Sequence, residues 1–212
     1  MMKKNGFTLA EVLITLAIIG VVATMTLPAL MTNTAEQQAK TGLKKGINTL
    51  TEAAQMSQAI DGYGYEGLDS NGTGDDTDQS LYGLLSRRTQ VDYVKSGLNK
   101  LGDATNYTVF FRDGSAVSFA PVAHSNTAAQ NKMQDDLLPY GIPVLFDTNG
   151  SKGPNQISNC QGKSGGSTTT DTGEASTCND KSLRVIKDQF GVRLRGGIAV
   201  PNGMAAKWAF EN

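Results

Sequence analysis

The side chain with the most unusual chemical setting in this sequence is the carboxylate of Glu11. It stands directly before residues 12–31, which carry no charged side chain. At about 1.5 Å per residue, a helix over this run would cross the roughly 30 Å hydrocarbon core of a bilayer. An unpaired carboxylate there costs on the order of a few kcal/mol, so an ionisable residue in a membrane span predicts a function. The alternative is a glutamate in the head-group zone just outside the bilayer.

A second candidate site has oxygen-bearing side chains at alternating positions, Asp147, Asn149 and Ser151. This spacing resembles the opening of an EF-hand loop, so Asp147 and Asn149 are candidate calcium ligands. The rest of the loop departs from that pattern, because Lys152 replaces the sharp-turn glycine and Ser158 stands where a bidentate glutamate should be. The alternative is an Asx-type turn that Asp147 and Asn149 form after a strand. Apart from calcium, we expect no cofactor.

Catalysis and nucleic-acid binding are not indicated by the composition. His124 is the only histidine, and its neighbours are typical of a loop, so the sequence offers neither a Ser–His pair nor a histidine-rich metal site. We therefore predict no catalytic residues and no enzymatic activity. The net charge of −1 and the pI near 5.8 leave no basic surface for nucleic acid.

Cys160 and Cys178 are the only cysteines. Lys3 and Lys4, just before the apolar run, favour a cytoplasmic N-terminus and place the cysteines outside the cytoplasm. Two cysteines supply neither a metal-ligand set nor a Cys-x-x-Cys redox pair. We therefore predict a disulfide, which would close a loop of about 19 residues and stabilise the fold by roughly 3 kcal/mol. Two free thiols are the alternative.

These groups must be positioned by a long N-terminal helix. Pro28 should kink or loosen this helix without ending it. Beyond Pro28, apolar residues recur every three or four positions, which predicts an amphipathic continuation whose stripe lies on a globular domain. Asp61-Gly62 supplies the stop signal. The predicted stripe consists of Ala35, Ala39, Leu43, Ile47, Leu50, Ala54 and either Ser57 or Ile60.

Residues 61–212 are expected to form one modest globular domain of the α+β class. Residues 81–101 predict a second helix or two short ones. Asp113-Gly114 predicts the turn of a hairpin. The predicted strands of a small antiparallel sheet are 107–112, 115–120, 142–146, 182–186 and 190–195, the last continuing through 197–200. Trp208, the only tryptophan, is expected on the domain core as a strand or capping residue.

The N-terminal motif gives a specific resemblance. Gly6 followed by Phe-Thr-Leu-Ala-Glu and the apolar run, with Pro28 further on, closely resembles the N-terminus of type IV prepilins and type II secretion pseudopilins. The resemblance implies cleavage by a prepilin peptidase between Gly6 and Phe7, and methylation of the new Phe7 amine. It also implies that Glu11 pairs with an N-terminal amine during filament assembly. Two poorly hydrated opposite charges relieve each other's desolvation in an apolar bundle.

The resemblance also implies an organisation for the whole chain. Residues 1–6 would be the leader, 7–31 the transmembrane and filament-core helix, 32–60 its amphipathic continuation, and 61–212 the extracytoplasmic domain. The subunit would sit in the cytoplasmic membrane as a single-pass protein, with the domain periplasmic or extracellular, and would enter a filament after processing. Its implied partners are other pilin-like subunits, the peptidase, membrane lipid, and an inner-membrane assembly platform with its ATPase.

Two alternatives stay open at this point. The motif does not separate a secretion pseudopilus from a type IV pilus or a DNA-uptake pilus. A different class of function is a membrane-tethered extracytoplasmic binding module that does not polymerise, for which an uncut Gly6 and tolerance of Glu11→Ala are the expected signs.

Overall fold

The structure is a computed structural model, and it describes residues 8–68, 80–96, 107–119, 141–162 and 175–212. The chain divides into two units, Met1–Gln38 and Ala39–Asn212. The prediction that residues 97–101 are helical and the loop around His124 lie outside the described residues.

The described part of the first unit is helical. It is the N-terminal portion of α1, which extends over Leu9–Ile60. Pro28 does not end the helix, as predicted, because the turns on both sides of it remain α-helical. The segment Leu9–Leu27 is long and apolar enough to cross a membrane, and none of it is buried.

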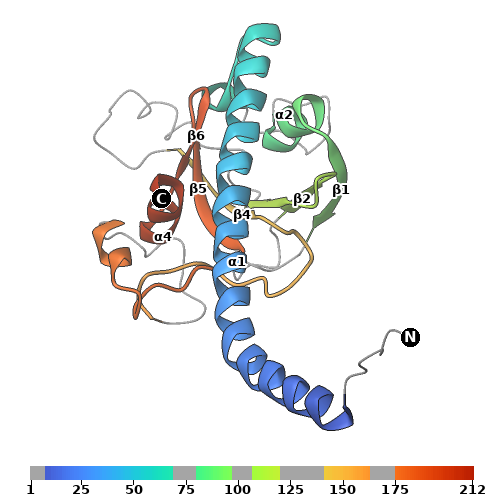
Figure 1. Ribbon diagram of the computed structural model, residues 1–212. Coiled ribbons are helices and arrows are strands. Elements are labelled where there is room, and N and C mark those ends of the chain that lie inside the picture. The colour runs from blue at the N-terminus through green and yellow to red at the C-terminus, as the bar shows by residue number, and fades with distance from the viewer. Residues whose placement is uncertain (1–7, 69–79, 97–106, 120–140, 163–174) are drawn as a thin grey trace. The chain divides into compact units, whose positions relative to one another are not determined.

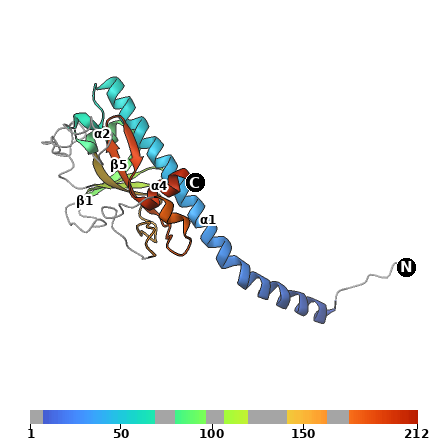
Figure 2. The same ribbon diagram turned by 90° about the vertical axis from the view of Figure 1, so that its left-hand side faces the viewer.

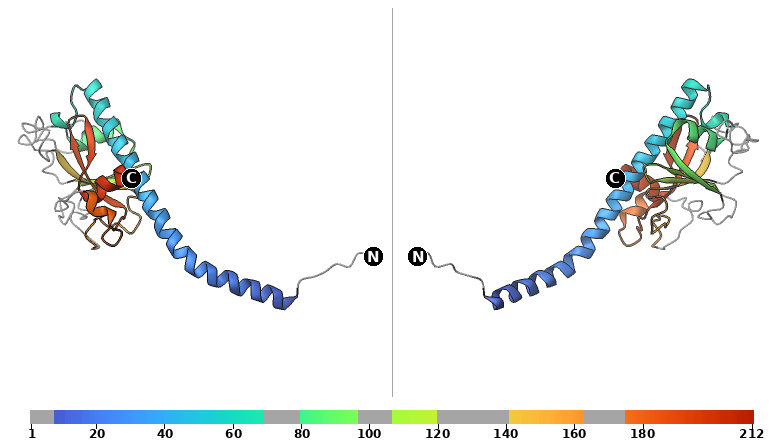
Figure 3. Two further views of the ribbon diagram at one scale, coloured as in Figure 1. Left: turned by 60° about the vertical axis from the view of Figure 1, so that its left-hand side comes forward. Right: turned by 90° about the vertical axis from the view of Figure 1, so that its right-hand side faces the viewer.

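The second unit is built on a sheet of six strands, each antiparallel to its neighbours and in chain order from β1 to β6. Figure 1 shows the remainder of α1 lying along this sheet, with α2 and α4 at its sides. Figures 2 and 3 show the same layers from other directions. The strands are β1 (Val91–Ser96), β2 (Tyr107–Phe111), β3 (Ala116–Phe119), β4 (Ile142–Asp147), β5 (Gln189–Arg195) and β6 (Ile198–Pro201). The other elements are η1 (Tyr65–Gly67), α2 (Leu81–Arg88), η3 (Ala175–Asn179) and α4 (Met204–Glu211). The predicted α+β class is confirmed.

The core forms where the stripe of α1 meets one face of the sheet. Most of the predicted stripe is buried there, from Ala39 to Ala54. At its first position the prediction was wrong, because Ala35 is exposed. At its last position the structure decides between the two alternatives, because Ser57 is buried and Ile60 is 65% exposed. Residues of the sheet that share this core include Val109, Val117, Phe119, Val144, Phe146, Phe190, Val192 and Leu194.

Two glycines on α1 let strand β4 and the residue after it approach the helix backbone. A Cβ built on Gly46 would lie 2.1 Å from the ring of Phe146, and one on Gly42 would lie 2.8 Å from Cβ of Thr148. Neither distance is possible for a real side chain without movement. Gly42 and Gly46 therefore set the spacing between α1 and the sheet.

The predicted hairpin is confirmed, and three other predictions are corrected. β2 and β3 pair across the Asp113-Gly114 turn, where Gly114 has φ +88°. Residues 91–96 form an edge strand and not the end of a helix, because Thr89 is extended and ends α2 at Arg88.

Residues 182–186 do not form a strand. An Asx turn occupies this segment, since Asp180 Oδ1 accepts hydrogen bonds from Ser182 N at 2.8 Å and Ser182 Oγ at 2.7 Å. Only Val185 makes a bridge, to Asn159. Residues 198–201 fold back as a separate strand and do not continue β5, because Gly196, with φ +55°, reverses the chain.

Candidate functional site

The Glu11 carboxylate closes the N-terminus of α1. Its Oε2 accepts hydrogen bonds from Thr8 N and Thr8 Oγ1, both at 2.8 Å, and Thr8 Oγ1 accepts one from Glu11 N at 3.3 Å. This reciprocal arrangement is a capping box, which satisfies backbone N–H groups that have no partner inside the helix. Gly6 and Phe7, the predicted processing residues, lie outside the described part of the chain.

The surface that follows Glu11 is apolar on all sides. Leu13, Ile14 and Leu16 are each about three-fifths exposed, at 59%, 61% and 60%. Exposing such a surface to water is unfavourable, because each CH₂ group costs about 0.8 kcal/mol in water relative to an apolar environment. Lipid or another apolar helix must therefore cover this segment. The helix is compatible with a single-pass membrane anchor.

The candidate calcium residues lie at the end of β4, and the geometry there is that of the Asx turn. Asp147 Oδ1 accepts a hydrogen bond from Asn149 N at 3.2 Å, and Oδ2 accepts one from Gln189 Nε2 at 2.8 Å. Both carboxylate oxygens of Asp147 thus already accept hydrogen bonds from neighbouring residues. The buried Oδ1 of Asn149 has no hydrogen-bond partner among the described residues, and it is the one atom that favours a ligand role. Calcium binding stays a prediction.

Asp188 holds the far side of the same loop. Its Oδ2 accepts from Asn155 N at 2.6 Å and its Oδ1 from Gln156 N at 2.8 Å. The carboxylate accepts hydrogen bonds from two backbone N–H groups of the loop, which would otherwise lack an acceptor within the protein. The described residues contain no group of three His, Cys, Asp or Glu side chains placed to hold a metal ion.

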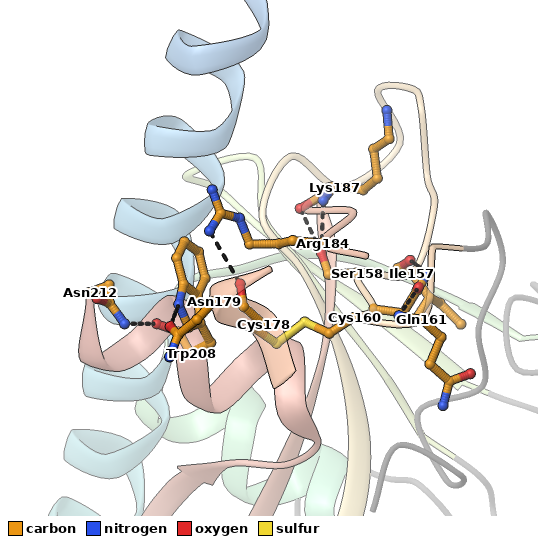
Figure 4. Close-up of a disulfide and its surroundings, with 11 residues drawn as sticks. Ile157, Ser158, Cys160, Gln161, Cys178, Asn179, Arg184, Lys187, Trp208 and Asn212 are labelled. Atoms are coloured by element: carbon orange, nitrogen blue, oxygen red, sulfur yellow. Dashed lines mark hydrogen bonds between the residues drawn. A yellow bond between two sulfur atoms is a disulfide. The ribbon is translucent and has the colours of Figure 1, made fainter. Parts of the chain in front are cut away.

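The predicted disulfide between Cys160 and Cys178 is present (Figure 4). Both cysteines are buried in the core cluster, at 1% and 0% exposure, and their Cα atoms are 5.1 Å apart. The described residues contain no free cysteine.

Trp208 lies beside the disulfide, and no sequence pattern predicted its surroundings. It belongs to α4 and not to a strand. Its ring is contacted by Lys40 of α1 and by Arg184, which lies between η3 and β5. Lys40 Nζ and Arg184 Cζ each lie 4.0 Å from the Trp208 ring centroid. The indole N–H donates to Asn179 Oδ1 at 3.2 Å.

A small open pocket of about 300 Å³ lies elsewhere on the second unit. Its charged residues are engaged in ion pairs, Lys45 Nζ with Asp113 Oδ2 at 2.8 Å and Arg88 Nη2 with Asp61 Oδ2 at 2.6 Å. The lining residues are Lys45, Thr49, Arg88, Thr89, Gln90, Phe111 and Asp113. They include no cysteine or histidine to serve as nucleophile or base for covalent catalysis.

Comparison with known proteins identifies the N-terminal segment. Residues 1–27 match the family model described as the prokaryotic N-terminal methylation motif. No curated protein and no solved structure matches the chain. The matched residues include Gly6, Phe7 and Glu11.

Proposed function

Because residues 1–27 carry the signature of type IV pilins and pseudopilins, we propose that this chain is the precursor of a filament subunit. The motif indicates a pilin-like or pseudopilin precursor, a structural and non-enzymatic class. In the proposed pathway a prepilin peptidase cuts between Gly6 and Phe7 and methylates the Phe7 amine. The mature subunit then joins other subunits in a type II secretion pseudopilus or a type IV pilus.

The observation that carries this proposal is the combination of the motif with an exposed apolar helical segment that has a single carboxylate, Glu11, in its first turn. A helix that leaves lipid must bury the same surface against its neighbours, because re-exposing it to water is unfavourable. A bundle of such helices provides that environment. The globular units would then lie outside the filament core.

Membrane insertion sets the proposed topology. Lys3 and Lys4 would stay in the cytoplasm, where the peptidase acts, and the second unit would be periplasmic or extracellular. The proposed partners are other pilin-like subunits, the peptidase, membrane lipid, and an assembly platform with its cytoplasmic ATPase. The disulfide supports an extracytoplasmic second unit, since disulfides persist in oxidising compartments.

The test is the intact mass and N-terminal sequence of the membrane-expressed chain, with an active or an inactivated prepilin peptidase. The expected product with the active enzyme lacks residues 1–6 and carries one added methyl group on Phe7. The inactivated peptidase should leave the chain uncut. A chain that keeps its first six residues in the presence of the active enzyme, or that starts near Ala23, would contradict the proposal and favour a tethered module.

A further inference from the structure

The pocket beside Lys45 is a cavity of the second unit that the N-terminal motif does not use. Its volume of about 300 Å³ is at the lower end of the range for small-molecule sites. Its walls come from α1, from the segment that ends α2 and precedes β1, and from the end of β2 with the β2–β3 turn. Figure 1 shows α2 and β2 on the same side of α1. We call this cavity the α1–α2 pocket.

The carboxylate oxygens around the α1–α2 pocket already have hydrogen-bond donors. Asp113 Oδ1 accepts from Ser115 N at 3.0 Å and from Ser115 Oγ at 2.6 Å. Asp113 Oδ2 pairs with Lys45 Nζ at 2.8 Å. Asp61 Oδ2 accepts from Arg88 Nη2 at 2.6 Å. These carboxylates are therefore poorly placed to receive a further cation.

Hydrogen-bond donors, in contrast, remain available in the lining. The side chain of Arg88 is only 16% exposed, and its Nε is buried without a hydrogen-bond partner in the part of the chain that the structure describes. The ammonium group of Lys45 has further donors beyond the one that its ion pair with Asp113 uses. Buried donors in folded proteins nearly always have an acceptor. The unsatisfied Arg88 Nε therefore indicates a site for an acceptor atom.

A carboxylate is the acceptor group that suits these donors best. Hydrogen bonds in which a partner is ionised are about twice as strong as neutral ones, and a guanidinium group matches the geometry of a carboxylate. Phe111, which is 7% exposed, adds an aromatic ring to the lining. Thr49 and Gln90 add a hydroxyl and a carboxamide. The lining thus fits a small ligand in which a carboxylate adjoins a short apolar group.

We propose that the α1–α2 pocket binds a small organic carboxylate. One carboxylate oxygen accepts from Arg88 Nε, the Lys45 ammonium supplies a second donor, and the apolar part of the ligand contacts Phe111. Binding forms no covalent bond. The inference depends on the geometry of the second unit and not on the filament function.

The test follows the Nε–H signal of Arg88 by nuclear magnetic resonance, in the full chain with isotope-labelled arginine in a neutral detergent. Arg88→Lys assigns the signal. Sodium butyrate is the probe, sodium chloride at equal concentration controls for ionic strength, and butyramide is a neutral ligand of the same shape. We expect a saturable shift with butyrate, with a dissociation constant on the order of millimolar. Butyramide should bind at least about tenfold more weakly.

Lys45→Gln tests the second donor. Because the Lys45 side chain is 63% exposed, its loss should weaken butyrate binding by only about twofold to fivefold. Lys44→Gln is the matched control, since Lys44 neighbours Lys45 in the sequence but is not among the residues that line the pocket. This variant should bind butyrate as the wild-type chain does.

Any of three results would overturn the proposal. One is an Arg88 signal that responds to butyrate no more than to sodium chloride. Another is equal binding of butyrate and butyramide, which would show that the pocket selects a neutral acceptor and not a carboxylate. The third is unchanged butyrate binding in Lys45→Gln, which would place the carboxylate away from the α1–α2 pocket.

Discussion

At the scale of single residues, Glu11 has two competing partners. Within the chain it caps α1 through Thr8. In the proposed filament it would pair with the Phe7 amine of a neighbouring subunit. Any side chain at position 11 with a hydrogen-bond acceptor in the same place could cap the helix, whereas the pairing with an amine needs a negative charge. A substitution that keeps the acceptor and removes the charge separates the two roles.

Glu11→Gln is that substitution, because glutamine also serves in a capping box. We expect Glu11→Gln and Glu11→Ala to insert into the membrane and to be cut by the peptidase, but both to be nearly absent from sheared filaments. Loss of one partner of a buried ion pair costs about 3–5 kcal/mol. Quantitative immunoblotting of the membrane and filament fractions measures the effect.

Glu36→Gln is the matched control for this prediction, since Glu36 belongs to the same helix beyond the apolar segment. It should assemble normally. Normal assembly of Glu11→Gln with failure of Glu11→Ala would show that the cap matters and the charge does not. Normal assembly of both would remove Glu11 from the assembly mechanism.

At the scale of elements, the contact between α1 and β4 depends on the absence of a side chain at Gly46. Alanine there would improve helix propensity by about 1 kcal/mol. It would also place Cβ 2.1 Å from the Phe146 ring. Overpacking a core costs about 1–3 kcal/mol, and here the obstacle is a buried ring. We expect Gly46→Ala to lower the free energy of unfolding by up to about 2 kcal/mol, the difference between these terms.

Urea denaturation of the second unit within the full chain, followed by the fluorescence of Trp208, measures this change. The control is Asn48→Ala, at an exposed position on the same helix, which should be neutral or slightly stabilising. If Gly46→Ala were as stable as Asn48→Ala, the close approach of Phe146 to the helix would not control the packing.

The same elements show what could be predicted from sequence. The stripe of α1 and the Asp113-Gly114 hairpin were predictable because each has a clear period or turn signal. β1 was mistaken for helix because Val91 and Val94 happen to extend the spacing of Leu84 and Leu85, and this spacing does not reveal the extended Thr89 between them. The Gly196-Gly197 pair was an available hairpin signal for separating β5 from β6.

The candidate site divides in a similar way. Thr8 and Glu11 form a readable capping-box pattern, and two lone cysteines made the disulfide predictable. The contacts of Trp208 with Lys40 and Arg184 were not predictable, because these residues are far apart in sequence and share no motif. Such a cluster is created by tertiary packing alone.

At the scale of the whole second unit, two ion pairs fasten α1 and the residue after it to their surroundings. Asp61, just after the helix, pairs with Arg88 at the end of α2, and Lys45 pairs with Asp113 in the β2–β3 turn. The hydrogen bond from Arg88 is the main cause that lowers the pKa of Asp61 below its usual value. At Asp113 partial burial alone would raise the pKa, but hydrogen bonds from Lys45 and Ser115 more than offset it, so the pKa is again lowered.

These lowered pKa values predict how stability depends on pH. A carboxyl group whose pKa is lower in the folded state stabilises the fold above its unfolded pKa, and the contribution is lost as the pH falls through the folded value. The melting temperature of the wild-type chain should therefore decrease as the pH is lowered below about 4. The Asp61→Asn/Asp113→Asn variant should have a lower melting temperature than the wild type at neutral pH, and its melting temperature should decrease less on acidification. The difference in melting temperature between the two proteins should therefore shrink by a few degrees at acid pH.

Circular dichroism melts of the full chain from neutral pH to about pH 2 test this prediction. Glu52→Gln, which removes an exposed carboxylate of α1, is the control and should follow the wild-type curve. A constant gap between wild type and the double variant at every pH would mean that neither carboxylate titrates differently in the folded state. Convergence at acid pH would instead show that charge at Asp61 and Asp113 holds α2 and the β2–β3 turn against α1.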